Sequence, residues 1–111
     1  MSDRLLAAQG IRRGLEFWPD ANHWCQHRLT DNAEDGTKQR CTYQMLNDGM
    51  GGSAPYSTNP TFRIAEAEIL RVAQARGIQG CVSVCDLNNS NNFDTVKSIV
   101  EEAAANLEKV Q

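Results

Sequence analysis

An amphipathic pattern marks the beginning of the chain. Apolar residues recur there at the three- and four-residue spacing that places them on one face of a helix, namely Leu5, Ala8, Ile11, Leu15 and Trp18. A helix is predicted from about Ser2 to Trp18, and Pro19 ends it because the residue before a proline is pushed out of the helical region. Gly10 and Gly14 lie on this helix at a cost in helix propensity, so a closely packed neighbour is expected against them.

Two later stretches carry the same pattern. One starts at Pro60, behind the capping residue Asn59, and ends at Gly77. The other starts near Asn92. The predicted inward residues are Phe62, Ala65, Ile69, Val72 and Ala73 in the first, and Phe93, Val96, Val100, Ala103, Leu107 and Val110 in the second. The stripe on the last helix is wide enough for an intramolecular core or for a self-association seam, so the sequence leaves a homodimer open.

A shorter helix is predicted over about Gln39 to Asp48, and Gly49 ends it. Its inward residues are Cys41, Met45 and Leu46. The sequence TDNAEDGTK before it and the sequence GMGGSAPYSTNP after it are rich in turn-forming residues. Both segments are predicted to be exposed loops.

The segment before the last helix is predicted to be extended. Its sequence, GCVSVC, alternates with a period of two from Gly80 to Cys85. One short strand is not stable alone, so the segment either pairs or forms a buried connector. The predicted fold is therefore mainly α, with four helices around one core and one short strand-like segment before the last helix. It becomes α+β if that segment pairs.

Length and composition favour one small globular domain spanning residues 1–111. The chain has 41% apolar and 23% charged residues, which is ordinary for a folded domain. Its net charge of −3 argues against nucleic acid, because phosphate binding needs a clustered basic surface. With no long apolar run and no secretory pattern, the chain is predicted to be cytoplasmic, without membrane contact and with free thiols. No cofactor is predicted.

Reactive side chains are densest in the segment His23-Trp24-Cys25-Gln26-His27. Catalysis by a cysteine needs a thiolate beside a base, with a third group to orient that base. Cys25 lies two residues from His23 and from His27, and Asp86 is a candidate for the third group. The alternative is that the two histidines are partly exposed polar residues beside a buried Trp24.

Cys81 and Cys85 are weak candidates for metal ligands. A structural zinc site needs four convergent Cys or His ligands, and the spacing of this pair is not that of a tight C-x-x-C knuckle. The alternative is that they are small buried residues without a chemical role.

A second polar segment, DLNNSNN, begins at Asp86 and includes Asn88. Its oxygen atoms can bind a cation or a polar ligand. The alternative is that they bond their own backbone and cap the next helix. In the glycine-rich loop, Tyr56 is predicted to anchor the loop against the core rather than to act as a catalytic phenol.

The chain resembles a small uncharacterised bacterial and phage family. The resemblance covers about Leu5 to Leu107 and is carried by Trp24-Cys25-Gln26, the acidic glycine-containing loop, and Cys41 at the start of a helix. It also includes the strand end at Val82, Val84, Cys85 and Asp86 and the final amphipathic helix, although Cys85-Asp86-Leu87 stands where the family has Trp-Asn-Asp. It implies the same architecture, singles out Trp24, Gln26, Cys41 and Asp86, and fits a mobile-element accessory protein such as an inhibitor of host defence.

The expected function is that of a non-enzymatic interaction module whose partner is another protein. Its expected contact surfaces are the acidic stretch from Asp31 to Asp35 and the loop from Gly49 to Asn59. The candidate binding residues are Trp24, Gln26, Glu34, Asp35, Tyr56 and Asn88. One alternative is a small enzyme or polar-ligand-binding domain with Cys25, His27 and Asp86 in one pocket, and a second is a structural zinc domain.

Overall fold

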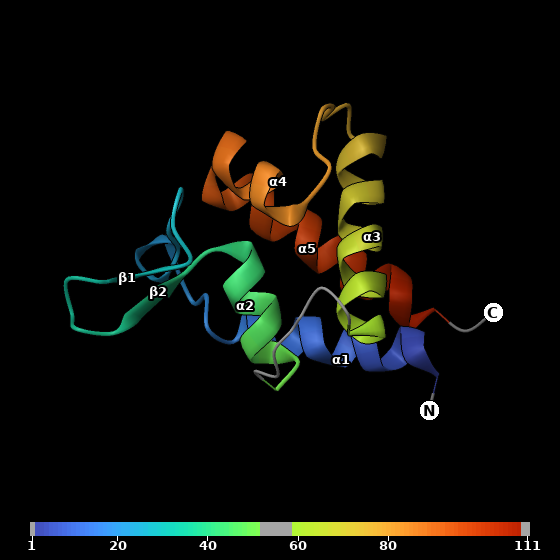
Figure 1. Cartoon of the computed structure of the whole chain (residues 1–111), viewed down its shortest axis with the longest axis horizontal. Coiled ribbons are helices and arrows are strands. Elements are labelled where there is room, and N and C mark those ends of the chain that lie inside the picture. Colours follow the sequence, from blue (N-terminus) through green and yellow to red (C-terminus); the bar gives the residue numbers. More distant parts are fainter. Residues whose placement is uncertain (1, 52–58, 110–111) are drawn as a thin grey trace.

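The computed structural model describes residues 2–51 and 59–109. These residues form five α-helices, one 3-10 helix and a two-stranded antiparallel sheet, so the predicted mainly helical class is confirmed. In chain order the elements are α1 (Asp3–Leu15), η1 (Ala21–His23), β1 (Thr30–Asn32), β2 (Lys38–Arg40), α2 (Thr42–Gly49), α3 (Pro60–Ala75), α4 (Val84–Ser90) and α5 (Phe93–Glu108). The β1–β2 hairpin extends from one end of the helical part (Figure 1).

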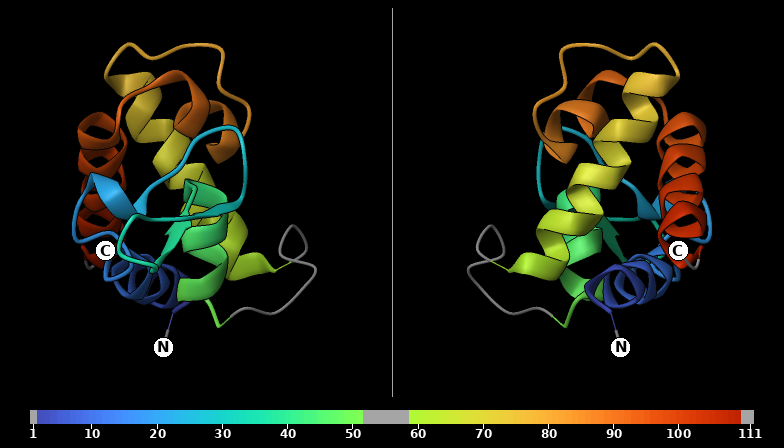
Figure 2. Two further views of the ribbon diagram at one scale, coloured as in Figure 1. Left: turned by 90° about the vertical axis from the view of Figure 1, so that its left-hand side faces the viewer. Right: turned by 90° about the vertical axis from the view of Figure 1, so that its right-hand side faces the viewer.

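One apolar cluster joins the helices. α1 contacts α2, α3 and α5, and α3 also contacts α5. Viewed from its two ends, the molecule has α1 along the bottom, α5 along one side and α3 across the middle (Figure 2). The predicted inward residues of α3 and α5 are buried, namely Phe62, Ala65, Ile69, Val72, Ala73, Phe93, Val96, Val100, Ala103 and Leu107. The stripe on α5 therefore packs into the intramolecular core, and Val110 lies outside the described residues.

The neighbour expected against Gly10 and Gly14 is α2. A Cβ added to Gly49 would clash with the carbonyl oxygen of Gly10 and would lie 2.7 Å from the amide nitrogen of Gly14. Arg13 closes the contact, since its Nε donates to the carbonyl oxygen of Gly49 at 2.8 Å. The two helix backbones thus meet directly where the sequence predicted a close approach.

The ends of the first two helices differ from the prediction. α1 ends at Leu15, and Trp18 lies beyond it, fully buried, with its Nε1 donating to the carbonyl oxygen of Arg40 at 3.0 Å. Leu5 lies at the margin of the apolar stripe and is 37% exposed. α2 begins at Thr42 because Cys41 is its N-cap, and the Cys41 sulfur accepts a hydrogen bond from the backbone of Gln44.

The prediction of an extended, strand-like segment from Gly80 to Cys85 is wrong. Ser83 instead caps α4 in a capping box, in which its hydroxyl accepts from the backbone of Asp86 at 3.3 Å. The carboxylate of Asp86 accepts in return from the backbones of Ser83 at 3.2 Å and Val82 at 2.9 Å. The period of two thus spans the end of a loop and the first turn of a helix, which gives the fold a fifth helix.

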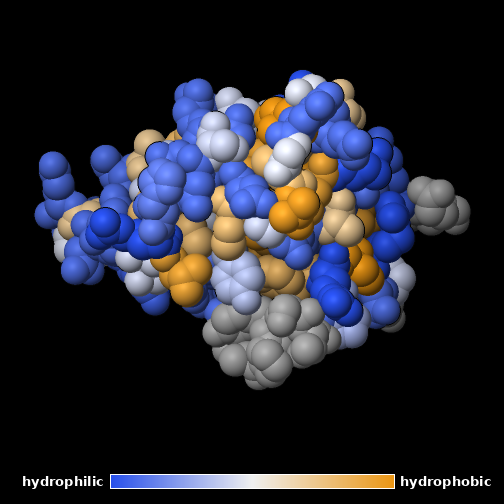
Figure 3. All heavy atoms as spheres, turned by 45° about the horizontal axis from the view of Figure 1, so that its top comes forward, coloured by the Kyte–Doolittle hydropathy of each residue, from blue (hydrophilic) through white to orange (hydrophobic). Residues whose placement is uncertain are grey.

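The segment TDNAEDGTK, predicted to be a loop, forms the β1–β2 hairpin. Thr30 pairs with Arg40 in antiparallel register, and Gly36 in the turn has a φ of 84°. Arg40 also forms a parallel bridge with Trp24 on the other side of β2, so β1 is the outer strand. Mostly hydrophilic residues cover this end of the molecule (Figure 3).

Among the described residues there is no helix with the length and apolar character needed to cross a membrane.

Candidate functional site

Asn88 is the centre of a hydrogen-bond network that joins three parts of the chain. Its side chain is fully buried on α4. Its Oδ1 accepts from Trp24 Nε1 at 2.6 Å, from the backbone of Thr42 at 3.0 Å and from the hydroxyl of Thr42 at 2.8 Å. Its Nδ2 donates to the carbonyl oxygen of Cys25 at 2.9 Å. The amide thus satisfies buried groups from the loop after η1 and from the start of α2.

Gln26 and Asn89 extend this network along α4. Nε2 of Gln26 donates to the carbonyl oxygens of Asn88 at 3.0 Å and Asn91 at 2.8 Å, at the end of the helix where carbonyls lack helical partners. Oδ1 of Asn89 accepts from the backbone of His27 at 2.7 Å, and His27 has a φ of 63°. We call the five residues Trp24, Gln26, Thr42, Asn88 and Asn89 the polar junction. The two polar segments that the sequence singled out separately therefore contact each other.

The thiol of Cys25 lies against the backbone. Its Sγ donates to the carbonyl oxygens of Arg28 at 3.5 Å and Leu29 at 3.7 Å, and the residue is 7% exposed. Burial raises the pKa of this thiol to about 11. Because the thiolate is the nucleophilic form, Cys25 carries very little of it at neutral pH.

The predicted grouping of Cys25, His27 and Asp86 is not formed. Asp86 is held in the capping box, and within residues 2–51 and 59–109 no hydrogen bond joins any two of the three side chains. His23 ends η1 and turns away from Cys25, with its Nδ1 2.8 Å from Oδ1 of Asp20 and its Nε2 3.6 Å from Oδ2 of Asp35.

The four cysteines do not converge on a metal site. Cys81 and Cys85 line different grooves. Burial raises the pKa of the Cys41 thiol, and burial followed by the nearby Cys41 raises that of Cys85. In the part of the chain that the structure describes, no group of three or more His, Cys, Asp or Glu residues is placed to hold a metal ion.

A small groove opens beside the polar junction, and we call it the thiol groove. Its volume is about 200 Å³. It is lined by the segment before β1, by Cys41 and by one face of α4, and the complete set is His27, Arg28, Leu29, Cys41, Cys85, Asn88 and Asn89.

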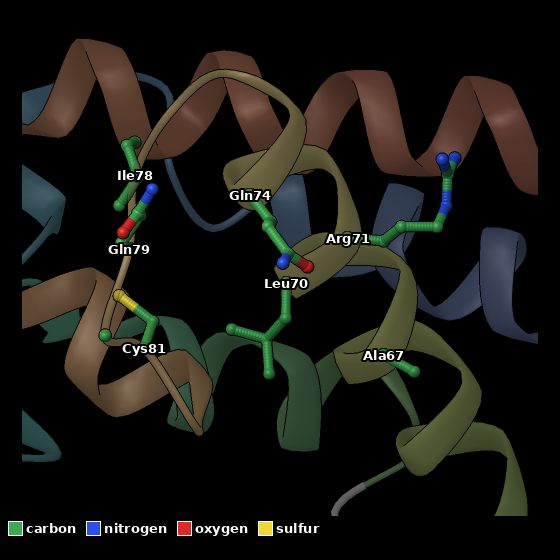
Figure 4. Close-up of a pocket in the computed structure, with 8 residues that line it drawn as sticks. Ala67, Leu70, Arg71, Gln74, Ile78, Gln79 and Cys81 are labelled. Atoms are coloured by element: carbon green, nitrogen blue, oxygen red, sulfur yellow. The ribbon is translucent and has the colours of Figure 1, made fainter.

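A larger groove of about 440 Å³, the α3 groove, lies between α3 and the loop before α4. Figure 4 shows Leu70 and Gln74 of α3 on one side and Ile78, Gln79 and Cys81 of the loop on the other. Arg71 points away from the loop residues in Figure 4, and its guanidinium pairs with Glu68.

The hairpin carries the predicted acidic residues, and their carboxylates differ in what they bind. Asp35 accepts from the backbone and hydroxyl of Thr37, and these bonds lower the pKa of its carboxyl. Asp31 pairs with Arg28 at 3.1 Å. Glu34 is exposed, and its carboxylate has no hydrogen bond or ion pair to any residue of the described ranges. Tyr56, also predicted as a binding residue, lies outside those ranges.

Sequence reasoning missed two residues that fix this region. Thr42 supplies two of the three donors to Asn88. Arg40 links the hairpin to the helices, with its Nε 2.6 Å from Oδ2 of Asp48 and its guanidinium 3.9 Å from the centre of the Phe17 ring. Neither residue belongs to a local motif, so no sequence signal was available for them.

Comparisons of this chain with family models, with curated proteins and with solved structures found no match.

Proposed function

We propose that this chain is a non-enzymatic protein-interaction module whose contact element is the β1–β2 hairpin. One contrast carries the proposal. The side chains of the polar junction bond to one another and to the backbone, whereas the carboxylate of Glu34 at the hairpin turn is exposed and has no partner among residues 2–51 and 59–109. An exposed and uncompensated charge on a projecting element is available to a partner of opposite charge.

The chemistry of Cys25 and of the neighbouring polar junction supports a binding role over a catalytic one. A nucleophilic cysteine needs a lowered pKa and a base within hydrogen-bond reach. Cys25 has a raised pKa and donates to two backbone carbonyls instead. The hydrogen-bonding capacity of Asn88 is likewise used inside the fold. These hydrogen bonds hold the loop after η1 in place.

The hairpin is held in a defined position, which favours specific recognition. Arg40 bonds to Asp48 of α2, and the carbonyl oxygen of Arg40 accepts from buried Trp18. Gln39 donates to the carbonyl oxygen of Asn22 at 2.8 Å. A preorganised element loses less conformational entropy when a partner binds.

The outer edge of β1 favours contact through side chains rather than addition of a strand. Ala33 donates to the carbonyl oxygen of Thr37, so the backbone N–H and C=O of Asp31 point toward β2, and those of Asn32 point outward. The outward amide of Asn32 donates to the carboxylate of Asp31 at 2.9 Å. That bond occupies a donor that an added strand would need.

The resemblance to a bacterial and phage family adds a biological context to this proposal. An acidic module from a mobile element fits an accessory protein that covers a basic surface of a host defence protein.

Charge reversal at Glu34 tests the proposal. Wild type, Glu34→Lys and Glu16→Lys are immobilised and exposed to lysate from the cells that make the chain. Glu16 is an exposed glutamate at the end of α1, so it controls for net charge. We expect a protein retained by wild type and by Glu16→Lys, and retained about tenfold less by Glu34→Lys, as for loss of a close charge pair. Equal retention by all three, or no retained protein, contradicts the proposal.

Asp35→Lys is a poorer test, because Asp35 holds the turn through Thr37. Cys25→Ser serves as a second control, since a binding role of the hairpin predicts unchanged retention for this variant. Loss of retention in Cys25→Ser would shift the contact from the hairpin to the segment around Cys25.

A further inference from the structure

We infer that the thiol groove receives one apolar side chain of a partner segment whose basic residue lies against Glu34. The inference rests on the proposed function, and it names the partner's chemistry: an extended basic peptide segment with a single apolar anchor. It is carried by the lining of the groove, by its position next to β1 and by the charge on the hairpin.

The size of the groove limits its occupant. Drug-sized ligands occupy pockets of roughly 300–1,000 Å³. The thiol groove, at about 200 Å³, is smaller and suits one side chain of leucine or phenylalanine size. It opens to the surface beside Leu29, which is 49% exposed.

The lining of the groove is suited to an apolar group. Asn88 has its amide bonded to Trp24, Thr42 and Cys25, so it offers little to a polar ligand. The groove also contains the thiols of Cys41 and Cys85, whose pKa values are raised by burial, so both stay neutral at neutral pH. Neutral thiols behave as small apolar groups, and together with Leu29 they form an apolar wall.

The negative charge next to the groove determines which residue of the partner segment lies beside its apolar anchor. Leu29 directly precedes β1, and Asp31 and Glu34 follow it along the hairpin. A partner cation at Asp31 must compete with Arg28, which already pairs with that carboxylate. Glu34 has no such competitor in the described ranges, so it is the complementary site for Lys or Arg.

The distance along the hairpin limits the spacing between anchor and cation. From Leu29 to Glu34 the chain advances five residues. β1 ends at Asn32 and Glu34 lies in the turn, so a rise of about 3.3 Å per residue gives an upper limit of roughly 16 Å, which an extended partner segment covers in at most about five residues.

The α3 groove is larger but gives no comparable argument. Its one charged lining residue, Arg71, points away from the hollow and pairs with Glu68. Its other polar residues are neutral amides, and they select no partner charge.

A peptide series tests the inference. Fluorescent Gly/Ser peptides carry one Leu and a later pair of Arg residues, with the spacing varied, and binding to the full chain is followed by fluorescence anisotropy. We expect the tightest binding at a spacing of at most about five residues. Replacing the peptide's Leu by Ala should weaken binding about tenfold or more, which is the effect of burying one leucine side chain.

Two protein variants locate the anchor. Leu29→Ala removes the exposed rim, and Cys85→Leu fills the groove, so each should abolish the advantage of the Leu peptide over the Ala peptide. Leu5→Ala is the matched control, because Leu5 is also partly exposed but lies on α1. It should leave the advantage intact.

The outcomes separate this inference from the proposed function. The anchor is overturned if Leu and Ala peptides bind equally, or if the Leu advantage survives both groove variants. In that case a loss of Arg-dependent binding in Glu34→Gln still supports the hairpin as the contact element. Binding that depends on neither Leu nor Glu34 overturns both. Self-association lost in Leu29→Ala, measured by sedimentation, identifies a second copy as the occupant and also overturns the inference.

Discussion

The apolar core formed by α1, α3 and α5 and the polar junction are stabilised by different kinds of interaction. In α1, α3 and α5 the buried side chains are aliphatic or aromatic and recur at helical spacing, and α1 also buries Gly10 and Gly14. In the polar junction the buried or half-buried groups are amides, a hydroxyl and an indole, and the hydrogen bonds of Trp24, Gln26 and Thr42 to Asn88 span 46 to 64 residues of sequence. The stability of the apolar core is spread over many contacts, whereas that of the polar junction depends on a few individual hydrogen-bonding atoms.

This difference predicts different responses to mutation. Removal of one apolar side chain leaves a cavity that the neighbours partly fill. Removal of a buried hydrogen-bond acceptor leaves its donors unpaired, and each unpaired buried group costs about 1–3 kcal/mol. The polar junction should therefore be the more sensitive region per atom removed.

The largest effect is expected for Asn88→Ala. It leaves Trp24 Nε1 and both donors of Thr42 without their shared acceptor, and it leaves the carbonyl of Cys25 without its Nδ2 donor. We expect the free energy of unfolding to fall by about 4 kcal/mol, measured by urea denaturation. Asn89→Ala on the same helix removes fewer bonds and should cost about 1 kcal/mol. Similar losses for the two variants would mean that Asn88 is not the centre of the network.

A somewhat smaller effect is expected for Gly49→Ala in the contact between α1 and α2. The new methyl group meets backbone atoms of Gly10 and Gly14, which cannot move aside cheaply. Overpacking of this kind costs about 1–3 kcal/mol, and we expect the upper end of that range.

Gly10→Ala is the matched comparison for Gly49→Ala. The three atoms nearest to its added Cβ all belong to the side chain of Met50, which is flexible and half-buried. Alanine also gains about 1 kcal/mol in helix propensity over glycine. If Gly10→Ala lowers the free energy of unfolding as much as Gly49→Ala does, Gly49 is not the position where the two helices are packed most tightly.

The smallest effect is a dependence on alkaline pH through Cys25. Its pKa is about 11 in the folded protein, above the ordinary value of 9.0. Between these values the unfolded state has released the thiol proton and the folded state has kept it, so stability falls as pH rises. We expect a fall of about 1–2 kcal/mol between pH 9 and 11 in wild type relative to Cys25→Ala. Parallel pH profiles for the two proteins would contradict the raised pKa.

The same contrast explains which parts of the fold could be predicted. The residues of α3 and α5 are visible in the sequence because helical burial repeats locally. Ser83 and Asp86 also carried a usable signal, since Ser-x-x-Asp is a capping pattern, but the neighbouring alternation of valines favoured a strand. The Asp35-Gly36 pair is likewise typical of a hairpin turn, but its flanking strands lack apolar alternation.

The polar junction could be predicted only as a list of polar residues. Trp24, Gln26 and Asn88 were all named from the sequence as binding candidates, and the structure brings them together. Their pairing depends on where α4 lies in three dimensions, and no helix was predicted for the residues of α4. Their partners therefore could not be assigned before the fold was known.

The long reach of Asn88 also has a consequence for the order in which the protein is completed during synthesis. Trp24, Gln26 and Thr42 leave the ribosome well before Asn88 and Asn91, which supply their acceptors. α1 likewise waits for α5, its main helical neighbour in the core. Trp24 and Gln26 therefore lack these native hydrogen-bond partners until Asn88 and Asn91 have been synthesised, so the polar junction forms only after α4 has left the ribosome.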